Sequence, residues 1–167
     1  MQNYALFDEA FLRSVDLIQE SPVHLINPVS ENFARLITSL VPGLLKNVIE
    51  NQVHQNVLRF FESGRIWNEV NGKIKERKAL AWCVVAKRTS IDFYAVKEAL
   101  TALLVSLGFQ EELITWTQVI APSAPWYKPY QTATIAINGQ VIGIMGKGNP
   151  LLLVKLGMQE EIDAAFA

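Results

Sequence analysis

Two Asn-Gly pairs constrain this chain more than any other feature. Asn71-Gly72 lies between the runs "VLRFFESGRIW" and "KALAWCVVAKR", and Asn138-Gly139 lies inside "TATIAINGQVIGIMG". Asn-Gly favours the tight turn between two antiparallel strands, because both residues tolerate a positive φ. The continuous apolar run "ALAWCVVA" predicts a returning strand that is buried on both faces. We therefore expect two hairpins and a largely antiparallel sheet.

Two longer helices are predicted from apolar spacing. The first covers residues 40–55, with Ser39 as N-cap and Pro42 in the first turn, where its missing N–H costs nothing. The second covers "SIDFYAVKEALTALLVSLGF", is capped by Ser90 or Asp92, and ends at Gly108. Its predicted buried face consists of Val96, Leu100, Leu103, Leu104 and Leu107.

The other segments complete a mixed order of elements. We expect a short helix after Asp8, a short strand in "SPVHLINPV", and either helix or strand in "ENFARLIT". "LITWTQVI" predicts a strand, "APSAPWYKPY" a loop, "NPLLLVKLGM" a short helix closed by Gly157, and "EIDAAFA" a final strand. This order does not alternate strand and helix, so we predict a single α+β domain over residues 1–167.

Composition narrows the classes of function. The chain has 167 residues, of which 50% are hydrophobic, and a net charge of −1. That charge excludes a strong overall basic field for nucleic acid, although a local basic patch stays open. No apolar run approaches the ~18 residues of a membrane helix, and the N-terminus does not match a signal peptide. The single Cys83 predicts a buried strand residue in a reducing, cytosolic protein.

No motif predicts a catalytic, cofactor-binding or metal site. "GIMGKGNP" lacks the Ser or Thr that follows the lysine of a phosphate loop, and His24 and His54 have no metal-ligand spacing. Glu62, in "FESGR", is expected to be buried and hydrogen-bonded. "PWYKPY" places Trp126, Tyr127 and Tyr130 around Lys128, which suits a protein contact better than base stacking in a neutral chain.

Four motifs in order resemble one family. "NPVSENFARLITSLVPGLL", "RFFESGRIW", "IDFYAVKEALTALLVSLGF" and "TATIAINGQVIGIMGKGNP" are similar to stretches of bacterial phenylalanine–tRNA ligase β subunits. The resemblance runs from about Ile18 to the C-terminus. It implies the catalytic-like module of the β chain, with the class II aminoacyl-tRNA synthetase fold of an antiparallel sheet flanked by helices. The start at Met1 then predicts a fragment of a longer β chain.

The resemblance also implies a role without chemistry. Class II enzymes use an Arg from an R-x-E set, but here Trp67 stands two residues before Glu69, and "GIMGKGNPLLLVKLG" has no Arg in place of the third motif. The family enzyme is an (αβ)2 assembly that uses ATP and magnesium to attach phenylalanine to tRNA. We expect no cofactor in this chain, the α subunit as partner, tRNA reached through the complex, and a cytoplasmic location without membrane or DNA contact.

The predicted subunit interface lies on two segments. It comprises Leu44 and Val48 on the helix at 40–55, and Trp126, Tyr127 and Tyr130 in the proline-rich loop. Three alternatives stay open. In the first, the chain is a free-standing synthetase paralogue that binds an amino acid or regulates a partner. In the second, it is a ligase with a displaced active site. In the third, it is an RNA-binding module that depends on "PWYKPY".

Overall fold

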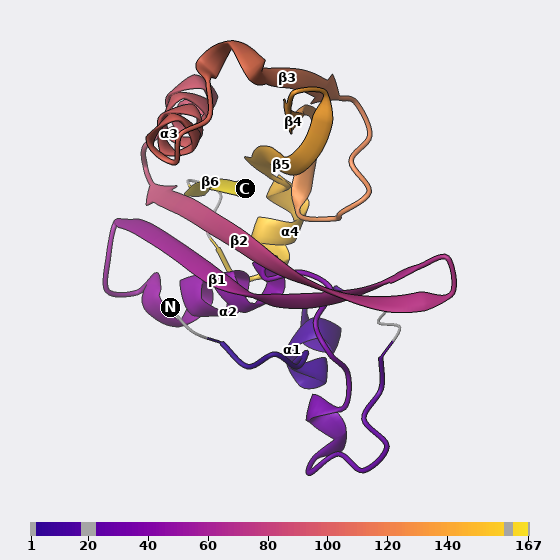
Figure 1. Ribbon diagram of the computed structural model, residues 1–167. Helices are drawn as coiled ribbons and strands as arrows, with labels where there is room; N and C mark the ends of the chain where they lie inside the picture. The colour runs from indigo at the N-terminus through magenta and orange to yellow at the C-terminus, as the bar shows by residue number, and fades with distance from the viewer. Residues whose placement is uncertain (1–2, 18–22, 159–161, 167) are drawn as a thin grey trace. The chain divides into compact units, whose positions relative to one another are not determined.

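The protein is an α+β chain with antiparallel strands and flanking helices, as the sequence predicts (Figure 1). A computed structural model describes residues 3–17, 23–158 and 162–166. The chain divides into two compact units, and each is described by itself. Unit 1 comprises Met1–Gln55 and Arg59–Cys83, and unit 2 comprises Asn56–Leu58 and Val84–Ala167. Among the described residues, no helix is long and apolar enough to cross a membrane.

Unit 1 begins with short helices. Asp8 caps the first of them by accepting a hydrogen bond from the Phe11 N–H at 3.0 Å, as predicted. The start of "ENFARLIT", for which both helix and strand were expected, forms a single 3-10 turn at Glu31. The helices of this unit are α1 (Glu9–Ser14), η1 (Glu31–Phe33) and α2 (Val41–Asn51).

Two local predictions in unit 1 need correction. The predicted strand at 21–29 is wrong over residues 23–29, where only His24 forms an isolated bridge, with Arg35; residues 21 and 22 lie outside the described part. The helix at 40–55 is confirmed but shorter, because α2 ends at Asn51 and Val53 beyond it is 78% exposed. Ser39 still supports its start by accepting from the Val41 N–H at 3.2 Å.

A long hairpin lies mainly in unit 1, with its first two residues and its last four in unit 2. β1 (Val57–Val70) and β2 (Lys73–Lys87) are neighbours in the sheet, joined at Asn71-Gly72. Asn71 has φ 54° and Gly72 has φ 72°, which confirms the predicted turn. Burial on both faces of β2 is wrong at Leu80, which is 52% exposed. Leu80 and its buried neighbours point to opposite faces, since side chains alternate along a strand.

Burial alternates along both strands of the hairpin. On β1 the buried residues are Leu58, Glu62 and Ile66. On β2 the alternating buried residues are Ala81, Cys83 and Val85. Even positions of β1 and odd positions of β2 therefore share the face that is covered at the base of the hairpin.

Unit 2 contains an antiparallel sheet in the order β6-β5-β4-β3. β3 pairs with β4 from Ile114↔Ile137 to Val119↔Thr132, and β4 pairs with β5 through the turn at Asn138-Gly139. Both turn residues have positive φ, which confirms the second hairpin. The strands are β3 (Ile114–Val119), β4 (Tyr127–Ile137), β5 (Gln140–Gly148) and β6 (Ile162–Phe166).

The helices of unit 2 begin and end where local signals predict. Asp92 caps α3 by accepting from the Tyr94 N–H at 2.9 Å, and Gly108 follows it with φ 96°. Asn149 caps α4, and Gly157 follows with φ 70°. The bounds are α3 (Phe93–Ser106), η2 (Glu111–Leu113) and α4 (Pro150–Lys155).

The predicted apolar face of α3 is correct only in part. Val96 and Leu104 are buried, but Leu107 is 66% exposed and lies past the last helical residue. Leu100 and Leu103 are half-buried. Helical spacing selects one side of a helix, but the width of the covered strip depends on how much of the neighbouring sheet reaches it.

Candidate functional site

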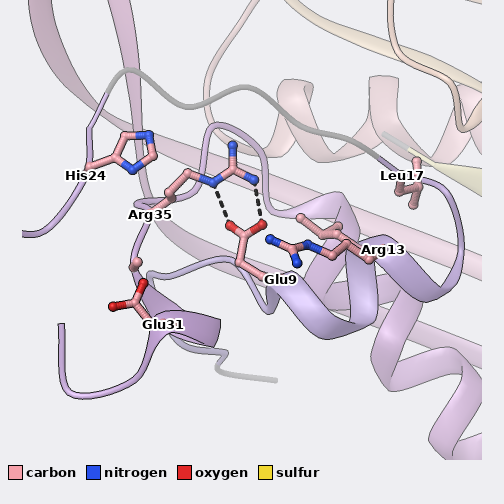
Figure 2. A pocket seen from close by; sticks show the side chains of 8 residues that line it. Glu9, Arg13, Leu17, His24, Glu31 and Arg35 are labelled. Carbon is pink, nitrogen blue, oxygen red and sulfur yellow. Dashed lines mark hydrogen bonds and ion pairs between the residues drawn. The ribbon is translucent and has the colours of Figure 1, made fainter.

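A hollow of about 460 Å³ lies in unit 1 between α1, η1 and the residues that follow η1 (Figure 2). We call it the N-terminal hollow. Its lining includes positively charged, negatively charged and apolar side chains. Those labelled in Figure 2 are Glu9, Arg13, Leu17, His24, Glu31 and Arg35.

The central feature of the N-terminal hollow is a two-bond ion pair. Arg35 Nε donates to Glu9 Oε1 at 2.6 Å and Arg35 Nη2 donates to Glu9 Oε2 at 2.7 Å (Figure 2). Glu9 is 9% exposed. The hydrogen bonds that Arg35 donates to Glu9 outweigh burial and raise the pKa of Arg35 above its ordinary value. The guanidinium carbon also lies 5.9 Å from the centroid of the Phe7 ring, so this pair fixes α1 against the strand-like segment at Arg35.

A second polar joint ties α1 to α2. Asp8 accepts from Phe11 N–H, from Asn32 Nδ2 at 2.9 Å and from Lys46 Nζ at 2.5 Å. Burial opposes ionisation of Asp8, but these donors together hold its pKa below the ordinary value. Asn32 Oδ1 in turn accepts from the Ala10 N–H.

In the N-terminal hollow, the central carboxylate is already engaged. Both oxygens of Glu9 are committed to Arg35, so this carboxylate is not poised to accept a proton from a substrate. Among the described residues that line the hollow, none carries a hydroxyl or a thiol. Within the described residues, no group of three or more His, Cys, Asp or Glu side chains is placed to hold a metal ion.

A second hollow, of about 680 Å³, lies in unit 2 between α3, η2 and β3. Lys97 Nζ lies 5.4 Å from the centroid of the Trp116 ring, a cation–π arrangement. Tyr94, at the start of α3, is 69% exposed beside it. The polar side chains that line this hollow are two carboxylates, one lysine, one phenol and the hydroxyl of Thr101.

Comparison with known proteins agrees with the motifs. The profile of the family described as "Phenylalanyl tRNA synthetase beta chain CLM domain" matches residues 1–165. The chain belongs to this family. Among curated relatives, it is 30% identical to the phenylalanine–tRNA ligase β subunit of Hahella chejuensis, over 93% of this chain and 20% of the relative. The β subunit of Aromatoleum aromaticum is 28% identical, over 98% of this chain and 22% of the relative.

The match is to one part of a longer protein. This chain spans about a fifth of the length of the curated relatives that it matches. Membership of the β chain CLM domain family confirms the resemblance seen in the four sequence motifs, and it extends the similarity from Ile18 back to the first residue.

Within this CLM domain, the structure buries most of the predicted interface residues. Leu44 and Val48 are each 0% exposed and belong to the core of unit 1. Trp126 and Tyr127 are each 4% exposed, with ring centroids 6.1 Å apart in unit 2. Tyr130 alone presents a largely exposed ring, at 67%. Contact with a partner subunit stays a prediction for all five.

Tyr130 is held in an unusual backbone position. Its φ is 62°, at the irregularity of β4 between Tyr127 and Thr132. Its N–H donates to the Ile120 carbonyl at 3.2 Å, and its carbonyl accepts from Gln118 Nε2 at 2.8 Å. The predicted loop at 121–130 is therefore partly wrong, since β4 already begins at Tyr127. The spacing of the prolines gave no sign that Tyr127, which lies between two of them, pairs with Gly148 on β5.

On β1, the position two residues before Glu69 carries no cation. Trp67 stands two residues before Glu69, and its backbone N–H donates to the Ile37 carbonyl at 2.9 Å. The nearest arginine, Arg65, is paired with Glu76 at 3.0 Å. Glu62, predicted to be buried and hydrogen-bonded, is confirmed at 4% exposure.

Cys83 is also placed as predicted. Its side chain is 0% exposed on β2, and burial raises the pKa of the thiol to about 12. A neutral, enclosed thiol is a poor nucleophile. By contrast, sequence reasoning missed the ion pairs Glu9–Arg35 and Asp8–Lys46. The two residues of each pair are far apart in the chain, so no local spacing predicts them.

Proposed function

We propose that this chain is a non-catalytic structural module of a phenylalanine–tRNA ligase β chain, which packs against the catalytic α subunit and stabilises the assembly. ATP and magnesium would serve the α subunit, and tRNA would be reached through the complex. The same proposal implies the cytoplasm, no membrane or DNA target, and a heterotetramer. We also propose that both units work together as one class II synthetase-like domain.

The observation that carries the proposal is Trp67. Aminoacyl activation develops negative charge on phosphates, and a synthetase stabilises that charge with cations aimed at the reacting groups. In this family member the position two residues before Glu69 holds an indole, and Arg65 is engaged by Glu76 on the same hairpin. An uncharged side chain cannot replace a guanidinium there. The antiparallel strands with flanking helices support the fold part of the proposal.

A direct test combines an activity assay with a binding assay. The purified chain is assayed for phenylalanine-dependent ATP–pyrophosphate exchange, alone and with the α chain of the same source. We expect no exchange from the chain alone and a stable complex with the α chain in size-exclusion chromatography. Exchange by the isolated chain would contradict the structural role and support the ligase alternative. Exclusive capture of an unrelated protein would favour the paralogue.

Tyr130 offers a sharper test of the interface. Tyr130→Ala removes an exposed ring without opening the core, so the folded state should be retained. We expect at least roughly tenfold weaker binding to the α chain, as for a ring at the centre of an interface. Tyr94→Ala, which removes an equally exposed ring from α3, serves as the matched control. Equal affinity of both variants and the parent chain would remove Tyr130 from the proposed interface.

A further inference from the structure

In the described part of the chain, the outer edge of β3 has no pairing partner. β3 is the last strand in the order of the sheet, and its ladder runs to β4 (Figure 1). The Asn138 N–H donates to the Leu113 carbonyl at 2.9 Å. Hydrogen-bonded pairs alternate along an antiparallel ladder, so the backbone groups of Thr117 also face β4. The N–H and C=O groups of Trp116 and Gln118 therefore point away from β4.

β3 lacks the features that usually protect a sheet edge. Natural edge strands carry charged residues, proline or a bulge, which block pairing with another chain. The sequence of β3, "ITWTQV", has no charged residue and no proline, and its register with β4 is continuous from Ile114 to Val119. Apolar side chains flank the strand, with Leu113 40% and Ile120 60% exposed. This edge is therefore open to an added strand.

The hollow of about 680 Å³ lies beside this edge, and we call it the β3 hollow. Ile114 and Trp116 line it from β3, and both lie on one face because side chains alternate along a strand. A strand added to β3 continues the same pleat and projects every second side chain on that face. The other lining residues come from α3 and η2, so these helices decide which side chain fits there.

The charge of the β3 hollow favours a cationic side chain. Glu98 on α3 and Glu111 on η2 are exposed, and neither forms an ion pair within the described residues. Two carboxylates against the single Lys97 leave the described lining with a net charge of −1. Lys97 Nζ lies 5.4 Å from the centroid of the Trp116 ring, so the ring already lies beside one ammonium group. A cation from a ligand can pair with the two carboxylates.

We propose that β3 and the β3 hollow bind an extended segment of a partner polypeptide, with a basic side chain of that segment in the hollow. An extended polypeptide carries N–H donors and C=O acceptors at the spacing of the outward backbone groups of β3. Its lysine or arginine pairs with Glu98 and Glu111. A nucleic acid offers no such backbone, and the net negative lining repels its phosphates. The inference goes beyond the proposed packing role, and its test needs no α chain.

The first experiment incubates the purified chain with an array of random heptapeptides, each acetylated and amidated so that its ends carry no charge. We expect the bound peptides to share a lysine or arginine with β-branched residues on either side, because β-branched residues favour the extended conformation. Binding to no peptide, or to peptides without a basic residue, would overturn the proposal.

The peptide that binds most strongly is then labelled and titrated with two variants in solution. Glu98→Gln/Glu111→Gln removes both carboxylates of the β3 hollow, and the control Glu50→Gln/Glu69→Gln removes the same charge from unit 1. All four positions are exposed, so urea unfolding of both variants should match the parent chain. We expect roughly tenfold weaker binding for the first variant, because the lost hydrogen bonds involve charged groups. The control should change affinity by at most about twofold. Equal losses would contradict a site at the β3 hollow.

Methylation of the peptide backbone tests the strand pairing itself. The N–H groups of an extended peptide point alternately to its two edges. Two versions of the bound peptide are N-methylated at alternate positions, one at the odd residues and the other at the even residues. We expect one version to lose binding, because its edge toward β3 has no donors left, and the other version to retain it. Equal binding of the two versions would exclude pairing with β3.

Discussion

Glu62, buried in the middle of β1, accepts two hydrogen bonds from Asn3, which lies 59 positions earlier in the chain. The Asn3 N–H donates to Oε1 and the Asn3 Nδ2 donates to Oε2, each at 2.7 Å. Asn3 Oδ1 then accepts from Asn47 Nδ2 at 3.2 Å, so α2 joins the same network. A carboxylate inside unit 1 thus connects its first described residue, its main helix and its hairpin.

Glu62→Ala should destabilise the folded state by about 1–3 kcal/mol, because it leaves the partly buried donors of Asn3 without an acceptor. Urea unfolding of parent and variant measures the difference. Glu69→Ala, an exposed change on the same strand, should stay within about 0.5 kcal/mol. Equal effects of the two substitutions would show that the Asn3 network contributes nothing to stability.

The Glu9–Arg35 pair should show coupling in a double-mutant cycle. Glu9→Gln, Arg35→Gln and the double variant are compared by thermal and urea unfolding. Both side chains are mostly enclosed, at 12% and 18% exposure, and the geometry is bidentate. We expect a coupling of roughly 1–3 kcal/mol, above the value for exposed pairs. Additive single effects would contradict a stabilising role for this pair.

Stability should fall in acid partly through Asp8. Burial alone would raise its pKa, but Lys46, the Phe11 N–H and Asn32 hold it below the ordinary value of 3.8. Its contribution is therefore complete above about pH 4 and is lost as the pH falls through the lowered folded-state pKa.

Asp8→Asn keeps a capping oxygen but loses the charge that faces Lys46. Unfolding free energies from pH 2 to pH 7 should show the variant less stable at neutral pH and equal to the parent chain in strong acid. Lys46→Met provides the reciprocal control, since it removes the same attraction. A constant difference across the pH range would exclude Asp8 as the titrating group.

Gly146→Ala should destabilise unit 2 by about 1–3 kcal/mol through overpacking. A Cβ at this position would lie 2.6 Å from Thr132 Oγ1 and 2.8 Å from Tyr127 Cδ1. Gly143→Ala on the same strand meets only Ile135 Cγ2, at 3.3 Å, and should cost less. Urea midpoints of the two variants compare them directly, and the reverse order would contradict the packing described for β4 and β5.

The family could be predicted from the sequence alone, whereas the burial of the predicted interface residues could not. The sequence motifs were enough to identify the family, because they depend on the order of residues along the chain. They did not reveal that Trp126 and Tyr127 are enclosed, since the aromatic cluster with its proline-rich surroundings resembles an exposed loop. The burial of these rings depends on the course of β4 through Tyr127 and its pairing with β5 at Gly148.

Features with a local physical cause were determined by the sequence alone. The turns at Asn71-Gly72 and Asn138-Gly139 follow from tolerance of positive φ, and the caps at Asp8 and Asp92 follow from the free N–H groups of a helix start. These signals act over a few residues, so they can be read without knowing the fold.

Tertiary structure decided which apolar residues are covered and which polar residues meet. Leu44 and Leu107 both fit a helical apolar pattern, yet one is 0% exposed and the other 66%. Glu62 finds Asn3 only because β1 returns to the N-terminal segment. Burial and pairing depend on contacts between segments far apart in the chain, and a pattern along one segment carries no information about what is packed against it.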